Sequence, residues 1–451
     1  MVNGQSIIGT IKLPSHWRYK QLNCFAIGNN VAYSFDMQTP NRTTWDFVSE
    51  YIDANGKNKS LNISKNEFDQ VLGTIMAGPD IARIYFAERK GKITFIKHFD
   101  VNLKTGSKII SSNEIELPNI ILGVRFTTDR LIFYSTENNK PILNVLTIDL
   151  KDSVSRVAYP LPIDISEYRK TDMSFVPGNS PVSISQALDK IKLMVDDRKI
   201  ILSVDEYINV LKKPGTLIYE LDLATGETTK NFITEPLNES SQSNFRSFVC
   251  ENFLFRTISQ AKTFTLKVFS RTTGELVSTK VVERDPESYT KVITVRNDND
   301  PPTRDKHLPD ITAFGYLLVP FVTAARDSVG EKFILLCGTN KNVKVRGPIG
   351  LTPAALITSI IMTTVKQLSD NSGLSKYFYF YGNAKEGFEF HTEDPLKGVQ
   401  TQIDTFELTT TSDKSKFRYK AIASHQSEHG IIGIYEDKVE NDIKVVEFTH
   451  K

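Results

Sequence analysis

Cysteine, tryptophan and histidine are scarce in this sequence. Its 451 residues include three cysteines, two tryptophans and seven histidines. The cysteines, Cys24, Cys250 and Cys337, lie far apart, each inside an apolar run, and no C-x-x-C pair occurs. Such a set is typical of buried free thiols in a reducing compartment, and it argues against a disulfide framework or a cysteine-bound metal.

An excess of one charge is also lacking. The chain has 55 basic and 53 acidic residues, so no global field attracts nucleic acid or an anionic membrane. The N-terminal segment MVNGQSIIGTIKLPSHW has no basic region followed by an apolar run and a cleavage site, which predicts a cytoplasmic protein. A secreted chain whose signal had been removed would look the same.

No convincing membrane span is present. Residues 347–365, GPIGLTPAALITSIIMTTV, carry no charge, but they include two prolines and their apolar residues are largely β-branched. That composition predicts the end of one strand, a turn and the start of another.

Helical periodicity is nearly absent. Instead, short β-branched and aromatic runs follow one another, separated by polar turns, as in ARIYFAER, KITFIKHFDV, RLIFYSTE and KFILLCGT. This pattern predicts an all-β chain.

One kind of turn recurs along the chain. FDVNLKTGSKII, YELDLATGETTK and KVFSRTTGELVST each place an apolar strand before a polar Thr-Gly turn, at Gly106, Gly226 and Gly274. EYIDANGKNKSL at Gly56 is a looser copy, and LTIDLKDSVSRVA around Ser153 keeps the pattern without glycine. Glycine suits these turns because it adopts a positive φ at little steric cost. The successive spacings 56–106, 106–153 and 226–274 are close to fifty residues, the period of a four-stranded β-propeller blade.

We therefore predict one closed β-propeller domain spanning residues 1–451, with eight blades favoured over seven. The predicted units are 20–65, 68–118, 120–163, 185–236, 245–283, 311–349, 351–411 and 415–449. The last has three clear strands, and the N-terminal SIIGTIKLP is expected to supply its fourth. Merging the irregular 351–411 region with a neighbour would give seven blades.

The D-L-x-T-G-E turn at Asp222–Glu227 resembles the blade turns of quinoprotein-like propellers. The resemblance covers these turns only, and it implies the propeller superfold without a specific family. The tryptophan-docking pattern of true quinoproteins is missing, as are the repeated WD40 signature and the kelch double glycines. Trp45-Asp46 occurs once and we interpret it as coincidence.

A metallopeptidase-like motif occurs near the C-terminus. His425, Glu428 and His429 have the H-x-x-E-H spacing, which binds zinc when both histidines project from one helix face. Here strand-like runs flank the motif and Gly430 follows it at once. We predict an exposed turn between strands, and no zinc site.

Two further stretches have a functional and a structural interpretation. Asp298 and Asp300 alternate as in a calcium loop, with Asp305 further on, but the glycine and glutamate of an EF-hand do not follow, so a solvated loop is favoured. In KYFYFYGNAKEGFEF, Phe378 and Phe380 share one strand face and Tyr377, Tyr379 and Tyr381 the other. Packing is favoured over sugar or peptide binding by the tyrosine row.

No sequence motif identifies an enzyme. G-x-S-x-G, Walker, G-x-G-x-x-G and HEXXH motifs are missing, so no catalytic, cofactor or metal residue is predicted. The sequence favours a non-enzymatic scaffold that binds another protein through two long insertions, 164–190 and 283–310. The alternative is a propeller enzyme or carbohydrate-binding protein with its site at the mouth of the central channel.

Overall fold

The computed structural model divides into two compact units. Unit 1 comprises Met1–Ser166, Pro348–Leu368 and Gly398–Lys451, and unit 2 comprises Glu167–Gly347 and Ser369–Lys397. The described residues are 5–12, 18–27, 30–38, 45–52, 58–60, 70–90, 93–102, 104–105, 107–117, 120–127, 129–166, 173–177, 184–196, 198–208, 214–234, 244–260, 263–283, 294–296, 318–326, 332–341, 375–391, 419–427, 430–437, 440 and 442–449.

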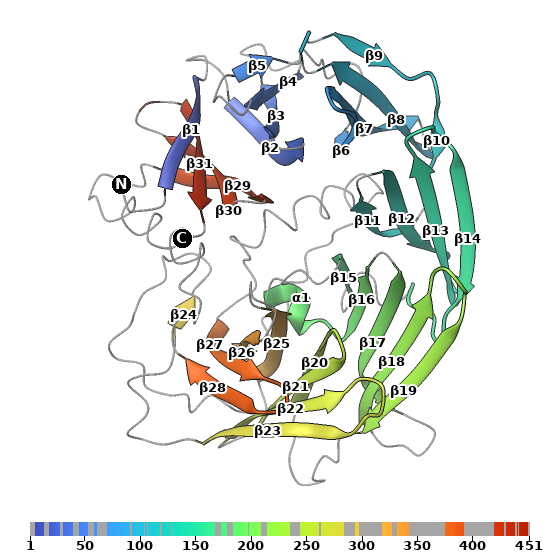
Figure 1. Cartoon of the computed structure of the whole chain (residues 1–451), viewed down its shortest axis with the longest axis vertical. Coiled ribbons are helices and arrows are strands. Elements are labelled where there is room, and N and C mark those ends of the chain that lie inside the picture. The colour runs from blue at the N-terminus through green and yellow to red at the C-terminus, as the bar shows by residue number, and fades with distance from the viewer. Residues whose placement is uncertain are drawn as a thin grey trace. The chain divides into compact units, whose positions relative to one another are not determined.

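The described part of unit 1 forms four antiparallel sheets (Figure 1). Three of them follow chain order, and the fourth joins the two ends of the chain. The strands, sheet by sheet, are β1 (Gln5–Lys12), β31 (Asp442–Thr449), β30 (Gly430–Asp437) and β29 (Tyr419–Ser427); β2 (Arg18–Ile27), β3 (Asn30–Gln38), β4 (Trp45–Ile52) and β5 (Asn58–Ser60); β6 (Gln70–Gly78), β7 (Ile81–Lys90), β8 (Ile93–Asn102), β9 (Lys108–Ile110) and β10 (Ile115–Glu116); and β11 (Ile121–Phe126), β12 (Arg130–Thr136), β13 (Ile142–Asp149) and β14 (Val154–Pro160).

The described part of unit 2 forms three sheets and one short helix, α1 (Ile184–Leu188). The strands, sheet by sheet, are β15 (Met173–Pro177), β16 (Ile191–Val195), β17 (Lys199–Ile208), β18 (Pro214–Asp222) and β19 (Thr228–Thr234); β20 (Asn244–Cys250), β21 (Phe253–Ser259), β22 (Thr263–Ser270) and β23 (Leu276–Glu283); and β24 (Thr294–Arg296), β25 (Leu318–Arg326), β26 (Phe333–Lys341), β27 (Ser375–Asn383) and β28 (Gly387–His391). The all-β prediction is confirmed for the described residues.

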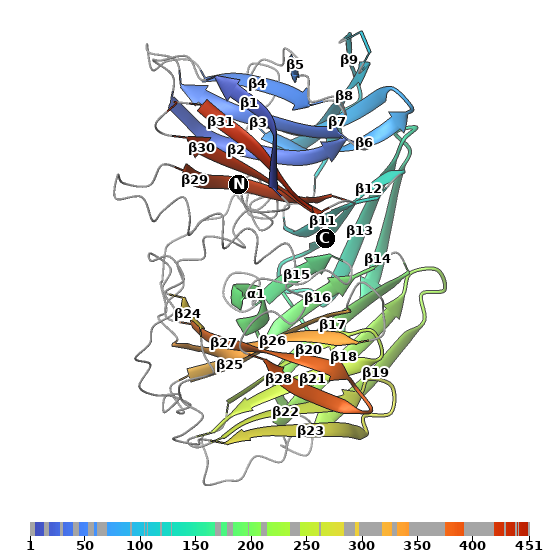
Figure 2. The ribbon, with the colours of Figure 1, turned by 60° about the vertical axis from the view of Figure 1, so that its left-hand side comes forward.

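The two ends of the chain share a sheet, as expected. β1 pairs with β31 in antiparallel register, with Gln5 opposite Phe448 and Lys12 opposite Asp442. Figures 1 and 2 show β1 lying alongside β31 and β30. This pairing covers an edge of the C-terminal sheet that would otherwise present unpaired backbone groups.

The two units predicted at 311–349 and 351–411 contribute to a single sheet. β27, from the second of them, pairs along most of its length with β26, from the first, with Phe333 opposite Gly382. Unit 2 therefore has three sheets, and with the four of unit 1 the described residues form seven sheets.

Side-chain-capped turns join the third and fourth strands of several sheets. Asp222 Oδ1 accepts hydrogen bonds from the backbone N–H groups of Ala224 and Thr225 at 2.9 and 3.0 Å. Gly226, at φ 73°, then donates its N–H to the Asp222 carbonyl. Gly274, at φ 74°, does the same with the carbonyl of Ser270. The predicted requirement for glycine is confirmed at both positions, while Gly106 and Gly56 lie outside the described residues.

Burial differs strongly between the strands. β16 is buried at all five positions, β13 alternates between buried and half-buried, and β14 is almost wholly exposed. First strands also contact those of the next sheet within each unit, as β2 does with β6 and β20 with β25. The apolar faces between sheets therefore make the core, as expected for stacked blades.

The aromatic run on β27 belongs to this core. Phe378 and Phe380 are buried, and Phe378 packs edge-on against Phe264 of the neighbouring sheet at 5.0 Å between ring centroids. Phe390 of β28 lies 5.1 Å from the Phe378 ring. The packing interpretation is confirmed for this face, whereas Tyr379 and Tyr381 are only half-buried.

The insertion at 164–190 contributes to the core as well. β15 adds to β16 in parallel, with Met173 opposite Ile191. The short helix α1 also lies in this insertion, and its Ala187 is fully buried. Of the 283–310 insertion, apart from Glu283 at the end of β23, only β24 is described. Among the described residues, no helix is long and apolar enough to cross a membrane, and 347–365 lie outside them.

Candidate functional site

The motif residues singled out in the sequence do not come together in a described site. His425 lies on β29, opposite Ile432 of β30, so it belongs to a strand and not to the exposed turn that the sequence predicted. Glu428 and His429 lie outside the described residues, as do Asp298, Asp300 and Asp305. The absence of a zinc site stays a prediction.

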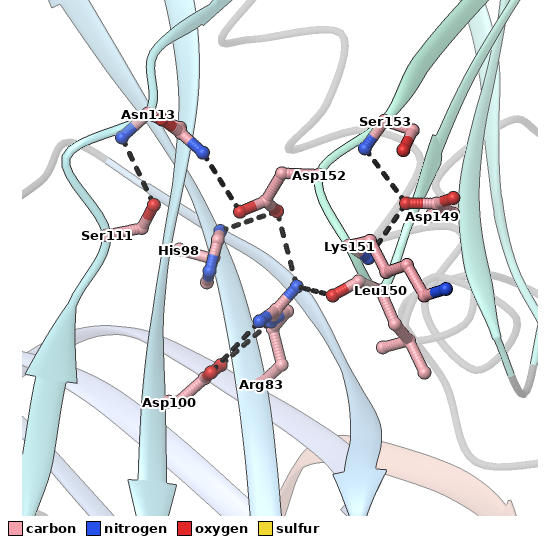
Figure 3. A network of polar contacts seen from close by, with 10 residues as sticks. All are labelled: Arg83, His98, Asp100, Ser111, Asn113, Asp149, Leu150, Lys151, Asp152 and Ser153. Carbon is pink, nitrogen blue, oxygen red and sulfur yellow. Dashed lines mark hydrogen bonds and ion pairs between the residues drawn. The ribbon is translucent and has the colours of Figure 1, made fainter.

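A buried polar cluster stands out between two sheets of unit 1. Arg83 and Tyr85 alternate on β7, and they face Asp100 and His98 of β8 directly across the ladder. Side chains two residues apart on a strand share a face, so all four lie on one side of the sheet. Asp152, from the turn between β13 and β14 of the neighbouring sheet, completes what we call the Arg83 cluster (Figure 3).

Arg83 holds this cluster together. Its guanidinium binds Asp100 in bidentate fashion, with Nε–Oδ1 2.8 Å and Nη2–Oδ2 3.0 Å. Nη1 donates to the Leu150 carbonyl at 2.6 Å and to Asp152 Oδ1 at 3.2 Å. Since the Arg83 side chain is only 10% exposed, water screens these charge-assisted bonds little, and those to Leu150 and Asp152 link the two sheets.

Asp152 reaches the cluster from an unusual backbone conformation. Its turn is one residue shorter than the Asp222–Glu227 turn, and the left-handed position falls on Asp152, at φ 61°. Glycine fills that position at Gly226 and Gly274. Aspartate tolerates the left-handed region better than most residues but less well than glycine. Here the gain is a carboxylate that bridges the sheets, because Asp152 Oδ2 also accepts a hydrogen bond from Asn113 at 3.1 Å.

His98 is the titratable centre of the Arg83 cluster. Its Nδ1 lies 3.5 Å from Asp152 Oδ1, and its ring lies 5.6 Å from that of Tyr85. Burial lowers the pKa of His98, the charge of Arg83 lowers it further, and Asp152 and Asp100 partly offset both effects. The imidazole is therefore neutral at neutral pH. Burial also raises the pKa of Tyr85 to about 12, and the hydrogen bond to Asp100 raises the pKa of Arg83.

The cluster contains a neutral imidazole with a carboxylate beside it, which is the base half of an acid–base site. Among the described residues, His98 hydrogen-bonds to no hydroxyl or thiol side chain, so they do not complete a triad around it. Sequence reasoning missed this cluster. The sequence feature that could have indicated it is the turn without glycine in LTIDLKDSVSRVA, but the sequence does not show which strand this turn faces.

Ion pairs join two other pairs of neighbouring sheets in unit 2. Arg271 Nε lies 2.9 Å from Glu220 Oε1, and Arg326 donates to Glu251 Oε2 at 2.9 Å through Nε. Each pair links a turn residue, Arg271 or Glu251, to a strand of the adjacent sheet. The Arg83 cluster is the one of these three that includes a histidine.

A second buried cluster lies between the sheets of β16–β19 and β20–β23. Asp205 accepts hydrogen bonds from Thr216 Oγ1 at 2.9 Å and from the Ser247 backbone at 2.8 Å, and Lys192 Nζ lies 3.5 Å from it. Arg256 donates to Thr216 Oγ1 at 2.8 Å. Burial lowers the pKa of the fully buried Lys192. These hydrogen bonds account for both Asp205 oxygens, so the cluster reads as structural.

Three carboxylates gather in the turn between β30 and β31. Oxygens of Asp437, Glu440 and Asp442 lie within 4.8 Å of one another. Lys444 Nζ already pairs with Glu440 and with Asp442, at 2.5 and 3.3 Å. Because an ammonium neutralises part of this cluster, we assign it no metal.

Comparison with known proteins gives a likeness of fold. No protein-family description and no curated protein matches the sequence. Among solved structures, the β-propeller domain of the Trilobed protease from Pyrococcus furiosus is similar at 9% identity and a TM-score of 0.39, covering 97% of this chain and 96% of that one. The acylaminoacyl peptidase of Pyrococcus horikoshii is similar at 10% identity and a TM-score of 0.35, covering 93% of this chain. Apocarotenoid oxygenase from Synechocystis is similar over 60% of this chain and 63% of its own, at 10% identity and a TM-score of 0.28.

These comparisons support a β-propeller fold and name no family for the chain. The expectation of a non-enzymatic scaffold is not supported by them, because the similar structures are enzymes or, for the Trilobed protease, a domain of one. The chain spans about half the length of the acylaminoacyl peptidase, at 49%.

Proposed function

We propose that this chain is an enzyme-associated β-propeller, whose blades frame the route by which substrate reaches a catalytic centre. In this proposal the Arg83 cluster is a lock that keeps two neighbouring blades together. The protein-binding role of the 164–190 and 283–310 insertions is not part of the proposal.

One observation carries the proposal: Asp152 adopts a left-handed conformation and bridges two sheets by accepting hydrogen bonds from Arg83 and Asn113, beside a buried histidine. Backbone strain and perturbed titratable groups concentrate at sites under functional constraint. A surface that only displays loops to a partner needs neither feature. A propeller around an enzyme's substrate route does need neighbouring blades that stay in contact, because a gap between two blades would admit substrates of the wrong size.

The ring itself is part of this proposal. Pairing of β1 with β31 supports closure, since it is the arrangement expected where the two ends of a propeller chain meet. Pairing of β27 with β26 supports seven blades over the eight favoured by the sequence. A single domain over residues 1–451 follows if the ring is closed.

The test measures hydrolysis of peptides, the substrate class to try first given the peptidases among the similar structures. The tagged chain is purified under native conditions from the cells that make it, and the preparation is assayed on fluorogenic peptides of increasing length. Hydrolytic activity should co-purify with the chain and favour short peptides. A preparation without hydrolytic activity would refute the association with a peptidase.

Variants then test the lock. Asp152→Gly suits the backbone conformation and removes the bridging carboxylate, so cleavage of long peptides should rise relative to short ones. Asp129→Asn, at an exposed turn of the same unit, is the matched control and should leave the ratio unchanged. If hydrolysis co-purifies but Asp152→Gly leaves the length preference intact, the lock is wrong while the enzyme association stands.

A further inference from the structure

A cavity of about 240 Å³ lies in unit 2, between the sheets of β16–β19 and β20–β23. It is bounded by the turn between β16 and β17, the turn between β20 and β21, and Arg271 from the turn after β22. Its volume equals that of about eight water molecules, which suits a small organic molecule. The Arg83 cluster lies in unit 1, so this cavity is distinct from it.

The wall of the cavity divides into an apolar and a polar part. Met194, Ile201 and Phe248 are all at least nine-tenths buried and make an apolar surface. Lys199 and Arg271 supply cationic groups. A small cavity that combines an apolar surface with a few convergent polar groups has features of ligand sites in proteins.

The guanidinium of Arg271 is the strongest indication of a ligand. Its side chain is 10% exposed, and its Nε is a buried donor without a hydrogen-bond partner among the described residues. Glu220 Oε1 lies 2.9 Å from Nε, but this is an ion contact, because Nε is left without a hydrogen-bond partner. A buried guanidinium with open donors is costly unless an acceptor satisfies them, and a planar carboxylate matches its geometry.

The acidic groups of the cavity are engaged elsewhere. Asp196 Oδ1 accepts the backbone N–H groups of Arg198 and Lys199, at 2.8 and 2.6 Å. Glu251 is paired with Arg326 through both Nε and Nη2. Glu220 is shared, since Lys199 Nζ lies 3.9 Å from it and Arg271 lies on its other side. Lys199 and Arg271 of the cavity wall thus share the carboxylate of Glu220, which is not itself part of the wall.

We propose that this cavity binds a small carboxylic acid with an apolar tail. The carboxylate would take the open donors of Arg271, with Lys199 adding charge, and the tail would lie against Met194, Ile201 and Phe248. Both parts of the ligand are needed, because the charge pairs with the guanidinium while the tail replaces water on the apolar wall.

The experiment compares two probes of the same shape by titration calorimetry of the full chain. One is 4-methylpentanoate and the other its neutral analogue, 4-methylpentanamide. The acid should bind at least about tenfold more tightly than the amide, as expected when one charge-assisted hydrogen bond is lost. Equal binding of acid and amide, or no heat with the acid, would overturn the proposal.

Variants place the binding in the cavity. Arg271→Met should weaken the acid about tenfold or more and leave the amide unchanged. Lys199→Met, at a side chain 44% exposed, should weaken the acid by a smaller factor and should not disturb folding. Arg130→Met, in an exposed turn of unit 1, is the control and should bind as the unmodified chain does. If Arg271→Met fails to fold, Lys199→Met decides the outcome, and acid binding that it leaves unaltered would refute the site.

Discussion

Replacing Arg256 with methionine should destabilise unit 2 strongly. Arg256 is fully buried on β21 and donates to Ser247 Oγ, the carbonyls of Ile233 and Thr234, and Thr216 Oγ1. Its guanidinium also lies 4.9 Å from the ring centroids of both Phe245 and Phe269. The side chain therefore connects the sheet of β16–β19 to that of β20–β23.

The size of the loss follows from these contacts. Each buried carbonyl left without a donor costs about 1–3 kcal/mol, and each desolvated cation–aromatic contact contributes up to about 2 kcal/mol. Methionine recovers part of the packing and avoids the cost of burying a charge, which offsets some of the loss. We expect a net decrease of about 3–5 kcal/mol in the free energy of unfolding, a large value for one substitution, because it breaks a buried hydrogen-bond network.

The assay must report on unit 2. Both tryptophans, Trp17 and Trp45, belong to unit 1, so tryptophan fluorescence is unsuitable and unfolding is followed by far-ultraviolet circular dichroism. A decrease of this size lowers the melting temperature by about 6–20 °C for a unit of this length. Hydrogen exchange should quicken in β18–β22 before it does in unit 1.

Arg198→Met is the matched control, because Arg198 is an exposed arginine of the same unit. Its stability should lie within about 0.5 kcal/mol of the unmodified chain. The reasoning is refuted if Arg256→Met costs less than about 1 kcal/mol, or if the control loses as much.

Three further predictions concern a turn, a histidine and two thiols. Gly226→Ala should lower the free energy of unfolding by about 1–2 kcal/mol, because no atom lies near the added Cβ and the strain is that of φ 73° alone, whereas Gly226→Asn should lower it less. Chemical denaturation of both variants measures these losses, and equal losses would contradict the prediction. Burial places the folded-state pKa of His98 below the ordinary value of 6.5, so the unfolded chain binds more protons in mild acid, and the stability present above about pH 6.5 should decline as the pH falls. His98→Gln, with Arg83, Tyr85, Asp100 and Asp152 left unchanged, should reduce this decline, as measured by urea midpoints on either side of that pH. Burial raises the pKa of Cys250 to about 12 and that of Cys337 well above its usual value, so both thiols should resist iodoacetamide in the native protein and react with it in urea. Mass spectrometry of the labelled peptides would show this, and rapid labelling of either thiol in the native protein would contradict its burial.

Much of the architecture was predictable because its causes are local. Two-residue alternation predicts strands such as β8 and β13 without knowledge of their neighbours. The Thr-Gly turns at Gly226 and Gly274 need a positive φ that glycine supplies. The spacing of these turns indicated a propeller, and the buried state of Cys250 and Cys337 followed from the apolar runs around them.

Sheet membership beyond nearest neighbours depended on the tertiary structure. β26 and β27 are separated by more than thirty residues, and nothing in either strand specifies the other as its partner, so the sequence divided one sheet into two units. The 164–190 insertion looked like a surface loop because it interrupts the repeat. In the structure it supplies β15 in parallel to β16, a pairing that strand patterns alone do not distinguish from an antiparallel one.

The Arg83 cluster shows the same limit in chemical terms. Residues 83, 98 and 100 come from one hairpin, so their shared face could be read from strand alternation. Asp152 is 69 residues away from Arg83, and only the packing of two sheets brings its carboxylate to the guanidinium and the imidazole. The sequence by itself determined that Asp152 stands in a turn that elsewhere contains glycine. The tertiary structure decided what that carboxylate faces, because burial and the charge of Arg83, neither of which is a local property, keep His98 neutral beside it.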